Sequence, residues 1–131
     1  MSSRILFLSG HPDDAHLLSQ MLQSLPLVVD HAENLRQART RLRRGEYDVV
    51  LTERALPDGS WLDALHLARE GPRDPVLIVT DPQADARFWS QALNLGAYDL
   101  LAQPFYEPEV RRILSYACSR PQRRQCAIAA T

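Results

Sequence analysis

Five short apolar segments, each followed by a stretch of helical periodicity, constrain the fold more than any other feature of this sequence. They are Ile5–Leu8, Leu27–Val29, Asp48–Thr52, Val76–Thr80 and Asp99–Ala102. Three of them are apolar at successive positions rather than at alternate ones, which is typical of strands covered on both faces. We therefore expect a parallel sheet that lies between two layers of helices.

Five helices are predicted to alternate with these strands. The first runs from about Asp13 to Ser24, the second from about Leu35 to Arg44, the third follows an N-cap at Ser60, the fourth carries Phe88 and Leu95, and the fifth starts at Pro108. Strict alternation of strand and helix is typical of doubly wound α/β proteins with right-handed crossovers. In such proteins ligands bind at the carboxyl ends of the strands, so the residues that follow each strand are the candidate site.

The charge balance and the cysteine content exclude several classes of function. With 15 basic and 16 acidic residues the net charge is −1, which gives no long-range field to attract nucleic acid or an anionic membrane. Cys118 and Cys126 are too few for a disulfide framework or a zinc cage, and the first apolar run is too short for a signal peptide or a membrane span. We expect a reduced, cytoplasmic protein that binds neither membranes nor nucleic acid directly.

The segment GHPDDA follows the first strand and resembles the His-Pro-Asp-Asp-Glu motif of zinc-dependent N-acetylglucosamine deacetylases. In that family a His and an Asp bind zinc, and another Asp acts as a base. Here Ala15 stands where the family has Glu, and His31 and His66 lack the acidic, histidine-rich context of its further ligand. A zinc site of this kind needs three protein ligands, so the partial motif predicts no deacetylase.

The same segment also has the features of a helix start. Pro12 suits the first turn of a helix, and Asp13 and Asp14 favour the positive end of the helix dipole. We favour this interpretation, and we expect both Asp side chains to point away from the strand ends. In that position they would not form a metal site.

Three longer segments resemble the landmarks of response-regulator receiver domains, namely YDVVLTERALPDGSWLDAL, PVLIVT and LGAYDLLAQPF. They come in the family's order and at its spacing, and the resemblance covers about Arg4 to Ser119. LPDGS and LGAYD look most like receivers of the nitrogen-regulator class. The resemblance implies a flavodoxin-like (βα)5 fold with strand order 2-1-3-4-5. It also implies a domain over residues 1–119, followed at 120–131 by a tail or the start of a linker to an output domain.

The resemblance further implies a phosphorylation site in which most reactive groups are replaced. A receiver holds Mg²⁺ on an acidic pair after the first strand and accepts a phosphoryl group on an Asp after the third; a Thr or Ser, a Lys and an aromatic residue complete the site. The corresponding residues here are Ser9 and Gly10 for the acidic pair, Glu53 for the acceptor, Thr80 for the hydroxyl, Gln103 for the Lys and Leu100 for the aromatic. We therefore expect no Mg²⁺ or other cofactor, no catalytic residue and no enzyme activity.

These replacements predict a pseudo-receiver that signals without an aspartyl phosphate. The Glu53 side chain is one methylene longer than Asp, and in-line transfer is sensitive to placement at the ångström level. We expect its carboxylate to accept hydrogen bonds from Gln103 and Thr80 instead. Three alternatives stay open: phosphorylation of Glu53, imitation of a phosphoaspartate by its charge, and a small-molecule or nucleotide sensor that uses the crevice.

The surface is then expected to carry the function. In receivers the face formed by the fourth helix, the fifth strand and the fifth helix contacts an output domain, a partner protein or a second copy, and we predict the same here. Candidates on this face are Trp89, Arg111 and Arg112, with core packing as the alternative for Trp89. Trp61 is expected either to cap the pocket or to pack on the third helix.

Overall fold

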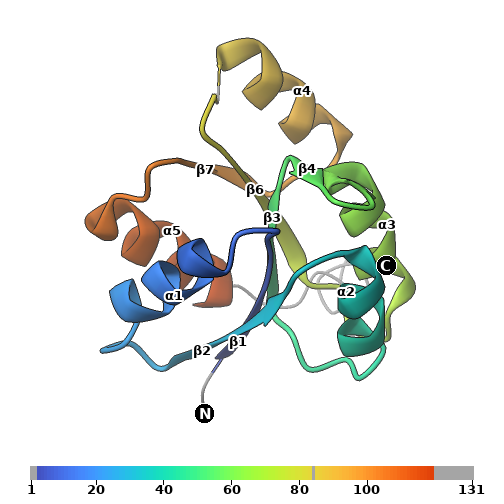
Figure 1. Cartoon of the computed structure of the whole chain (residues 1–131), viewed down its shortest axis with the longest axis horizontal. Coiled ribbons are helices and arrows are strands. Elements are labelled where there is room, and N and C mark those ends of the chain that lie inside the picture. Colours follow the sequence, from blue (N-terminus) through green and yellow to red (C-terminus); the bar gives the residue numbers. More distant parts are fainter. Residues whose placement is uncertain (1–2, 84, 120–131) are drawn as a thin grey trace, which may run out of the picture.

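The computed structural model describes residues 3–83 and 85–119, and the expected tail at 120–131 lies outside the described residues. Within this part, five long strands alternate with five helices (Figure 1). The strands are β1 (Ser3–Leu8), β2 (Leu27–Ala32), β3 (Val49–Glu53), β6 (Val76–Asp81) and β7 (Asp99–Ala102). The helices are α1 (Pro12–Met21), α2 (Leu35–Leu42), α3 (Trp61–Glu70), α4 (Ala86–Leu95) and α5 (Glu107–Ser119).

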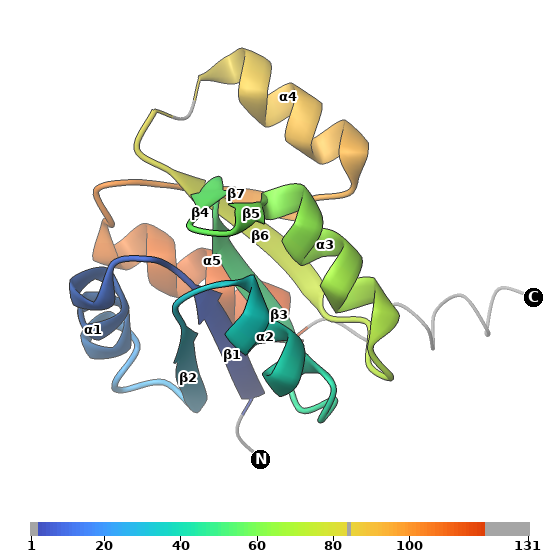
Figure 2. The same cartoon turned by 45° about the vertical axis from the view of Figure 1, so that its right-hand side comes forward.

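All five strands are parallel, in the order β2-β1-β3-β6-β7. This is the predicted 2-1-3-4-5 order, because two short strands that form a separate hairpin come between β3 and β6 in the numbering. Helices α1 and α5 cover one face of the sheet, and α2 and α3 cover the other (Figure 2).

Successive residues of β1 enter opposite cores, which explains why its sequence is apolar without alternation. Ile5 and Phe7 pack in the layer with α1 and α5, whereas Leu6 and Leu8 pack in the layer with α2 and α3. All four side chains are fully buried. The prediction of strands covered on both faces is therefore confirmed.

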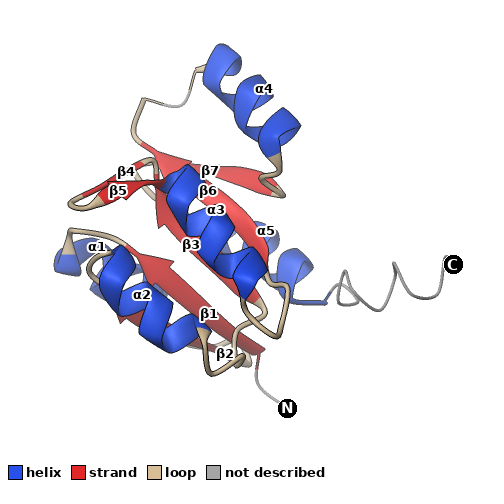
Figure 3. Cartoon of the chain, turned by 90° about the vertical axis from the view of Figure 1, so that its right-hand side faces the viewer, coloured by secondary structure: helices blue, strands red, loops and turns tan. Residues whose placement is uncertain are grey.

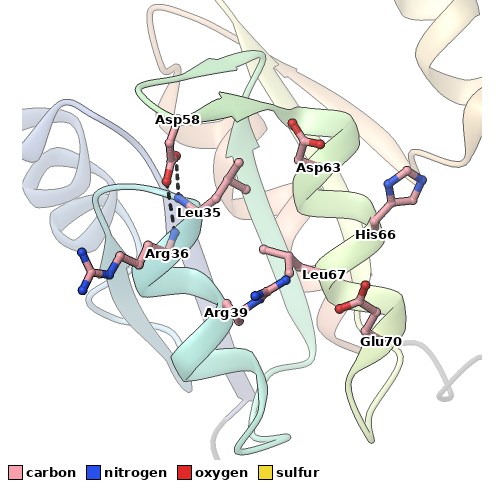
Figure 4. A pocket seen from close by; sticks show the side chains of 8 residues that line it. All are labelled: Leu35, Arg36, Arg39, Asp58, Asp63, His66, Leu67 and Glu70. Carbon is pink, nitrogen blue, oxygen red and sulfur yellow. Dashed lines mark hydrogen bonds between the residues drawn. The ribbon is translucent and has the colours of Figure 1, made fainter.

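The short hairpin after β3 was not predicted. It pairs β4 (Ala55–Leu56) with β5 (Gly59–Ser60) in antiparallel fashion, and the turn between them lies above α2 (Figure 3). Asp58 accepts hydrogen bonds from the backbone N–H groups of Leu35 and Arg36, at 2.9 and 3.2 Å, and so binds the hairpin to the first turn of α2 (Figure 4). Ser60 caps α3, as predicted.

Several predicted boundaries differ from the structure, most of them by one or two residues. Helix α1 ends at Met21 rather than Ser24, and α2 ends at Leu42, three residues before Gly45 with its positive φ of 69°. Strand β2 continues to Ala32, so that His31 pairs with Phe7 of β1 instead of following the strand. None of the helices among the described residues is long and apolar enough to cross a membrane.

Two ion pairs tie β1 to β2 and the residue before β3 to the segment before β6. Arg4 Nη2 lies 2.7 Å from Asp30 Oδ2, which also accepts a 2.7 Å hydrogen bond from the Tyr47 hydroxyl. Asp48 accepts from the Arg4 backbone N–H at 3.0 Å and from Arg73 at 2.6 Å. Burial alone would raise the pKa of Asp30, but the hydrogen bonds from Arg4 and Tyr47 outweigh it and lower that pKa below its usual value.

Candidate functional site

The predicted site residues gather at the carboxyl ends of the strands. Ser9 follows β1 directly, Glu53 ends β3, and Gln103 follows β7. Glu53 and Thr80 are partners in the β3–β6 register, so they lie side by side on the sheet. Glu53, Thr80 and Gln103 line a cavity of about 650 Å³ that lies over these strand ends.

The Glu53 carboxylate is held by the loop between β1 and α1. Its Oε1 accepts a hydrogen bond from the Gly10 backbone N–H at 3.0 Å. Its Oε2 accepts from Ser9 Oγ at 2.9 Å and lies 2.8 Å from His11 Nδ1, which must carry the proton because an ionised carboxylate only accepts. Glu53 is 7% exposed, so these bonds replace water almost completely.

The predicted hydrogen bonds from Gln103 and Thr80 to Glu53 are wrong. The longer side chain reaches sideways to the loop of the neighbouring strand β1, where two small residues leave room and offer donors. An acidic pair at these positions would repel the carboxylate. The substitutions at Ser9, Gly10 and Glu53 are thus complementary to one another.

Further hydrogen bonds stabilise the conformation of this loop. Ser9 is fully buried, and its Oγ accepts a hydrogen bond from the His11 backbone N–H at 2.9 Å while its proton goes to Glu53. His31 Nε2 donates to the Ser9 carbonyl at 2.7 Å. This role of His31 was not predicted, because its partner is a backbone carbonyl of a neighbouring strand's loop, which no sequence motif indicates.

His11 contacts Glu53 from the solvent side of the pocket. Its side chain is 72% exposed, against 10% for that of Glu53. The hydrogen bond to Glu53, and then the attraction between the two charges, raise the pKa of the imidazole above its ordinary value. The sequence analysis gave His11 no role once the helix start was preferred, although the spacing His11-x-x-Asp14 could have indicated one.

Both Asp13 and Asp14 were predicted to point away from the strand ends, and for Asp14 this is wrong. Asp13 is exposed, as expected of a residue that points away. Because α1 begins at Pro12, Asp14 is the third residue of the helix, and side chains of a helix tilt toward its amino terminus. Asp14 therefore faces the strand ends and lines the cavity, with Gln103 Nε2 3.5 Å from its Oδ2. Ligand atoms of His11, Asp14 and Glu53 all lie within 4.8 Å of one another.

This set of donors does not fit the Mg²⁺ that the family resemblance implies. Mg²⁺ requires octahedral coordination by oxygen ligands, mostly carboxylate and water. Ser9 and Gly10 supply no carboxylate, which leaves the carboxylates of Asp14 and Glu53 within reach of one ion. The third group within reach is an imidazole nitrogen, which is a poor ligand for Mg²⁺.

Two further features complete the pocket wall. The Thr80 side chain is fully buried, and its Oγ1 has no hydrogen-bond partner among the described residues. Arg54 Nη1 lies 3.3 Å from Asp81 Oδ2, and its guanidinium lies over the Phe88 ring at 4.0 Å from the centroid. The Arg54–Asp81 pair was not predicted. It directs the guanidinium of Arg54, the one guanidinium of the pocket wall, toward the Asp81 carboxylate.

Leu100 and the two tryptophans lie in or against the core. Leu100 is 1% exposed at the position of the family's aromatic switch. Trp61 begins α3, is 5% exposed, meets Phe88 of α4 edge-on in the core and does not line the pocket, so it does not cap the pocket. Trp89 is half-buried against the core beside α3, and its indole nitrogen is buried without a hydrogen-bond partner among the described residues.

The two candidate arginines of α5 point in different directions. Arg111 Nη1 donates to the Met21 carbonyl at 3.2 Å and to Ser24 Oγ at 2.8 Å. Arg111 therefore contacts the end of α1 rather than facing α4 and β7, which corrects its predicted place on that surface. Arg112 is exposed.

A second cavity, of about 480 Å³, lies between α2 and α3 (Figure 4). Arg36 and Arg39 of α2 stand opposite Asp63, His66 and Glu70 of α3. Charges of both signs line this groove, and its polar groups are exposed to water. It lacks the buried, converging groups of the first pocket.

Comparison with known proteins identifies the family. The sequence profile described as "Response regulator receiver domain" matches residues 5–115. The response regulator protein PilR of Pseudomonas aeruginosa is 32% identical over 115 residues, which are 87% of this chain and 26% of PilR. The transcriptional regulatory protein KdpE of Staphylococcus aureus is 30% identical over 111 residues, which are 85% of this chain and 48% of KdpE. The chain thus spans between a quarter and a half of these relatives.

Solved structures show the same fold. A response regulator from Thermotoga maritima superposes with a TM-score of 0.82 at 19% identity, covering 92% of this chain and all of that one. The beryllofluoride-activated NtrC4 receiver domain, solved as a dimer, superposes with a TM-score of 0.79 at 23% identity, covering 88% and 95% of the two chains. With a five-stranded parallel sheet in the order β2-β1-β3-β6-β7 and a profile match over residues 5–115, the chain belongs to the response regulator receiver domain family of two-component systems.

Proposed function

We propose that this receiver domain signals without a phosphorylated carboxylate and regulates an output domain or a partner protein through its surface. The observation that carries the proposal is the state of Glu53, whose two oxygens accept three hydrogen bonds from the β1–α1 loop. A carboxylate that attacks a phosphoryl group in line needs a free oxygen and a precise approach. Here attack would first require the loop to release Glu53.

The groups that neutralise charge during phosphoryl transfer are also replaced. Gln103 stands at the position of the Lys, and its amide lies near Asp14 instead of Glu53. Three carboxylates, those of Asp14, Glu53 and Asp81, line the cavity with Arg54 as the one guanidinium. An incoming phosphodonor, which is an anion, meets a pocket of negative charge, and the same field disfavours a nucleotide as a ligand.

The surface formed by α4, β7 and α5 is the proposed contact face. It carries exposed apolar side chains on α4, with Leu93 48% and Leu95 47% exposed, and a stacked pair of rings, Tyr98 and Tyr116, with centroids 6.5 Å apart. Apolar and aromatic side chains at the surface are typical of interfaces. A second copy of the chain, an output domain or a separate partner could each occupy this face.

The wider setting of the domain follows from the relatives and belongs to the same proposal. PilR and KdpE are a response regulator and a transcriptional regulatory protein, and the matched segment covers 26% and 48% of their lengths. We infer a receiver unit at residues 1–119 of a cytoplasmic, transcription-controlling system. The nitrogen-regulator subclass stays a prediction.

The proposal is tested with Mg²⁺ and a small phosphodonor such as acetyl phosphate, followed by intact mass measurement. We expect no mass increase for the native chain. The matched control combines Ser9→Asp, Gly10→Asp, Glu53→Asp and Gln103→Lys, which restores the family's reactive groups on the same fold and is expected to gain one acid-labile phosphoryl group. A stoichiometric phosphate on the native chain that Glu53→Gln removes would contradict the proposal.

A further inference from the structure

We propose that the pocket binds a first-row divalent transition metal ion, Zn²⁺ being the best match, through His11, Asp14 and Glu53. This site differs from the Mg²⁺ site of the family in its ligands, because one is an imidazole and one comes from the first turn of α1. It also goes beyond the proposed function, since it does not depend on whether Glu53 accepts a phosphoryl group.

The geometry of the three side chains carries the proposal. Zn²⁺ binds His nitrogen and carboxylate oxygen at about 2.0–2.2 Å, which places ligand atoms about 3.4 Å apart in a tetrahedral site. His11 Nδ1, one Asp14 oxygen and one Glu53 oxygen already lie within 4.8 Å of one another, and Nδ1 is 2.8 Å from Glu53 Oε2. A metal ion would take the place of the proton between these two atoms. Rotation of the side chains would have to move the ligand atoms by less than about 2 Å.

The two carboxylate ligands are held by hydrogen bonds from other groups, as is usual for metal ligands. Ser9 Oγ donates to the Glu53 oxygen that His11 also contacts, the Gly10 N–H donates to the other oxygen, and Gln103 lies 3.5 Å from Asp14. Such outer hydrogen bonds orient ligating carboxylates and reduce the entropy lost on binding. His11 is mostly exposed and makes no packing contact in the core, so its side chain can rotate toward the ion without disturbing the fold.

One observation that is independent of the three ligands points to a bound ligand at this place. Thr80 lines the same cavity, is fully buried, and leaves its Oγ1 without a hydrogen-bond partner among the described residues. A buried hydroxyl without a partner is costly, and a water on the metal would supply one. The pocket also carries a net charge of −2 when His11 is neutral, from three carboxylates and one guanidinium, and this charge is balanced by a divalent cation.

The donor set determines which ion is preferred. One nitrogen and two carboxylate oxygens, with a position left for water, suit Zn²⁺, Co²⁺ or Mn²⁺, whereas Mg²⁺ and Ca²⁺ prefer oxygen ligands alone. Affinity for such a site rises along the series from Mn²⁺ to Cu²⁺ and is high for Zn²⁺. We therefore expect Zn²⁺ to bind more tightly than Mn²⁺ and far more tightly than Mg²⁺.

The test is calorimetric titration of the chain with ZnSO₄ and with MgCl₂, in the absence of a phosphodonor. Both cysteines are first changed to Ser, since thiolates bind zinc. We expect one Zn²⁺ per chain, with the affinity lowered at least about ten-fold by His11→Ala and by Asp14→Asn. The controls are His16→Ala and Asp13→Asn, which change the same residue types on the exposed side of α1 and should leave the affinity unchanged.

A second measurement locates the ion. Mn²⁺ is paramagnetic, and in an NMR titration we expect it to broaden the backbone signals of residues 9–14 and Glu53 before those of α2 and α3. Absence of one-to-one Zn²⁺ binding, equal loss of affinity in His11→Ala and His16→Ala, Mg²⁺ binding as tight as Zn²⁺ binding, or broadening centred elsewhere would each overturn the proposal.

Discussion

The acids at the two ends of the sheet are satisfied in different ways. At the amino-terminal end, Asp48 contacts Arg73 at 2.6 Å and accepts from the Arg4 backbone N–H. Further along β2, Asp30 contacts Arg4 at 2.7 Å and accepts from the Tyr47 hydroxyl. At the carboxyl end, Asp14 and Glu53 face each other across a cavity, and their neighbours are a histidine, hydroxyls and an amide. The paired acids are held by permanent cationic partners, whereas Asp14 and Glu53 converge without one, and this difference underlies the proposed metal site.

The largest effect on the free energy of unfolding is expected at the amino-terminal end of the sheet. Asp48→Ala removes the acceptor for the Arg4 backbone N–H and for Arg73, and it leaves a half-buried donor without its partner. We expect the free energy of unfolding to fall by about 2 kcal/mol, measured by urea denaturation. The control Asp13→Ala, on an exposed part of α1, should change it by less than about 0.5 kcal/mol, and an equal effect of both would remove the contrast between the two ends.

A smaller loss of stability is expected from a substitution in the loop that holds Glu53. Ser9→Ala removes a fully buried hydroxyl that donates to Glu53 and accepts from the His11 N–H. We expect a loss of about 1.5 kcal/mol, together with faster hydrogen exchange at the backbone N–H groups of Gly10 and His11. Unchanged exchange at these two positions would show that the loop is held by other contacts.

The pH dependence of stability should separate the two ends further. The pKa of Asp30 is lowered from 3.8 in the folded chain, so its contribution is complete above the unfolded pKa and is lost as the pH falls through the folded one. Asp30→Asn should therefore flatten the decline in stability between about pH 5 and pH 2. A decline that is unchanged in this variant would assign the acid sensitivity to other carboxylates.

The smallest effect is expected for an acid of the pocket. Asp14→Asn keeps the shape of the side chain and loses only a charge that faces Glu53, with one weak contact to Gln103 at 3.5 Å. Without added metal we expect a change of less than about 0.5 kcal/mol, neutral or stabilising, in the same denaturation assay. A loss above about 1 kcal/mol would show that Asp14 supports the fold rather than a ligand.

Much of the fold could be predicted because it depends on local and periodic signals. Non-alternating apolar strands and capped helices with Ser60 and Pro108 near their starts indicated a (βα)5 sheet, and the order β2-β1-β3-β6-β7 confirmed it. The hairpin at Ala55–Ser60 was missed because strands of two residues have no periodicity. The length of β2 was underestimated because Asp30 and His31 are polar, although both form hydrogen bonds within the structure.

The sequence alone determined that Ser9, Gly10, Glu53, Thr80 and Gln103 stand at the ends of neighbouring strands, because parallel topology brings those ends together. Only the tertiary structure decided which of them touch. Glu53 reaches toward the β1–α1 loop rather than toward Thr80, and Asp14 turns back over the strand ends because α1 begins at Pro12. The direction of a side chain depends on distances of a few ångströms between separate elements, and spacing along the chain does not encode those distances.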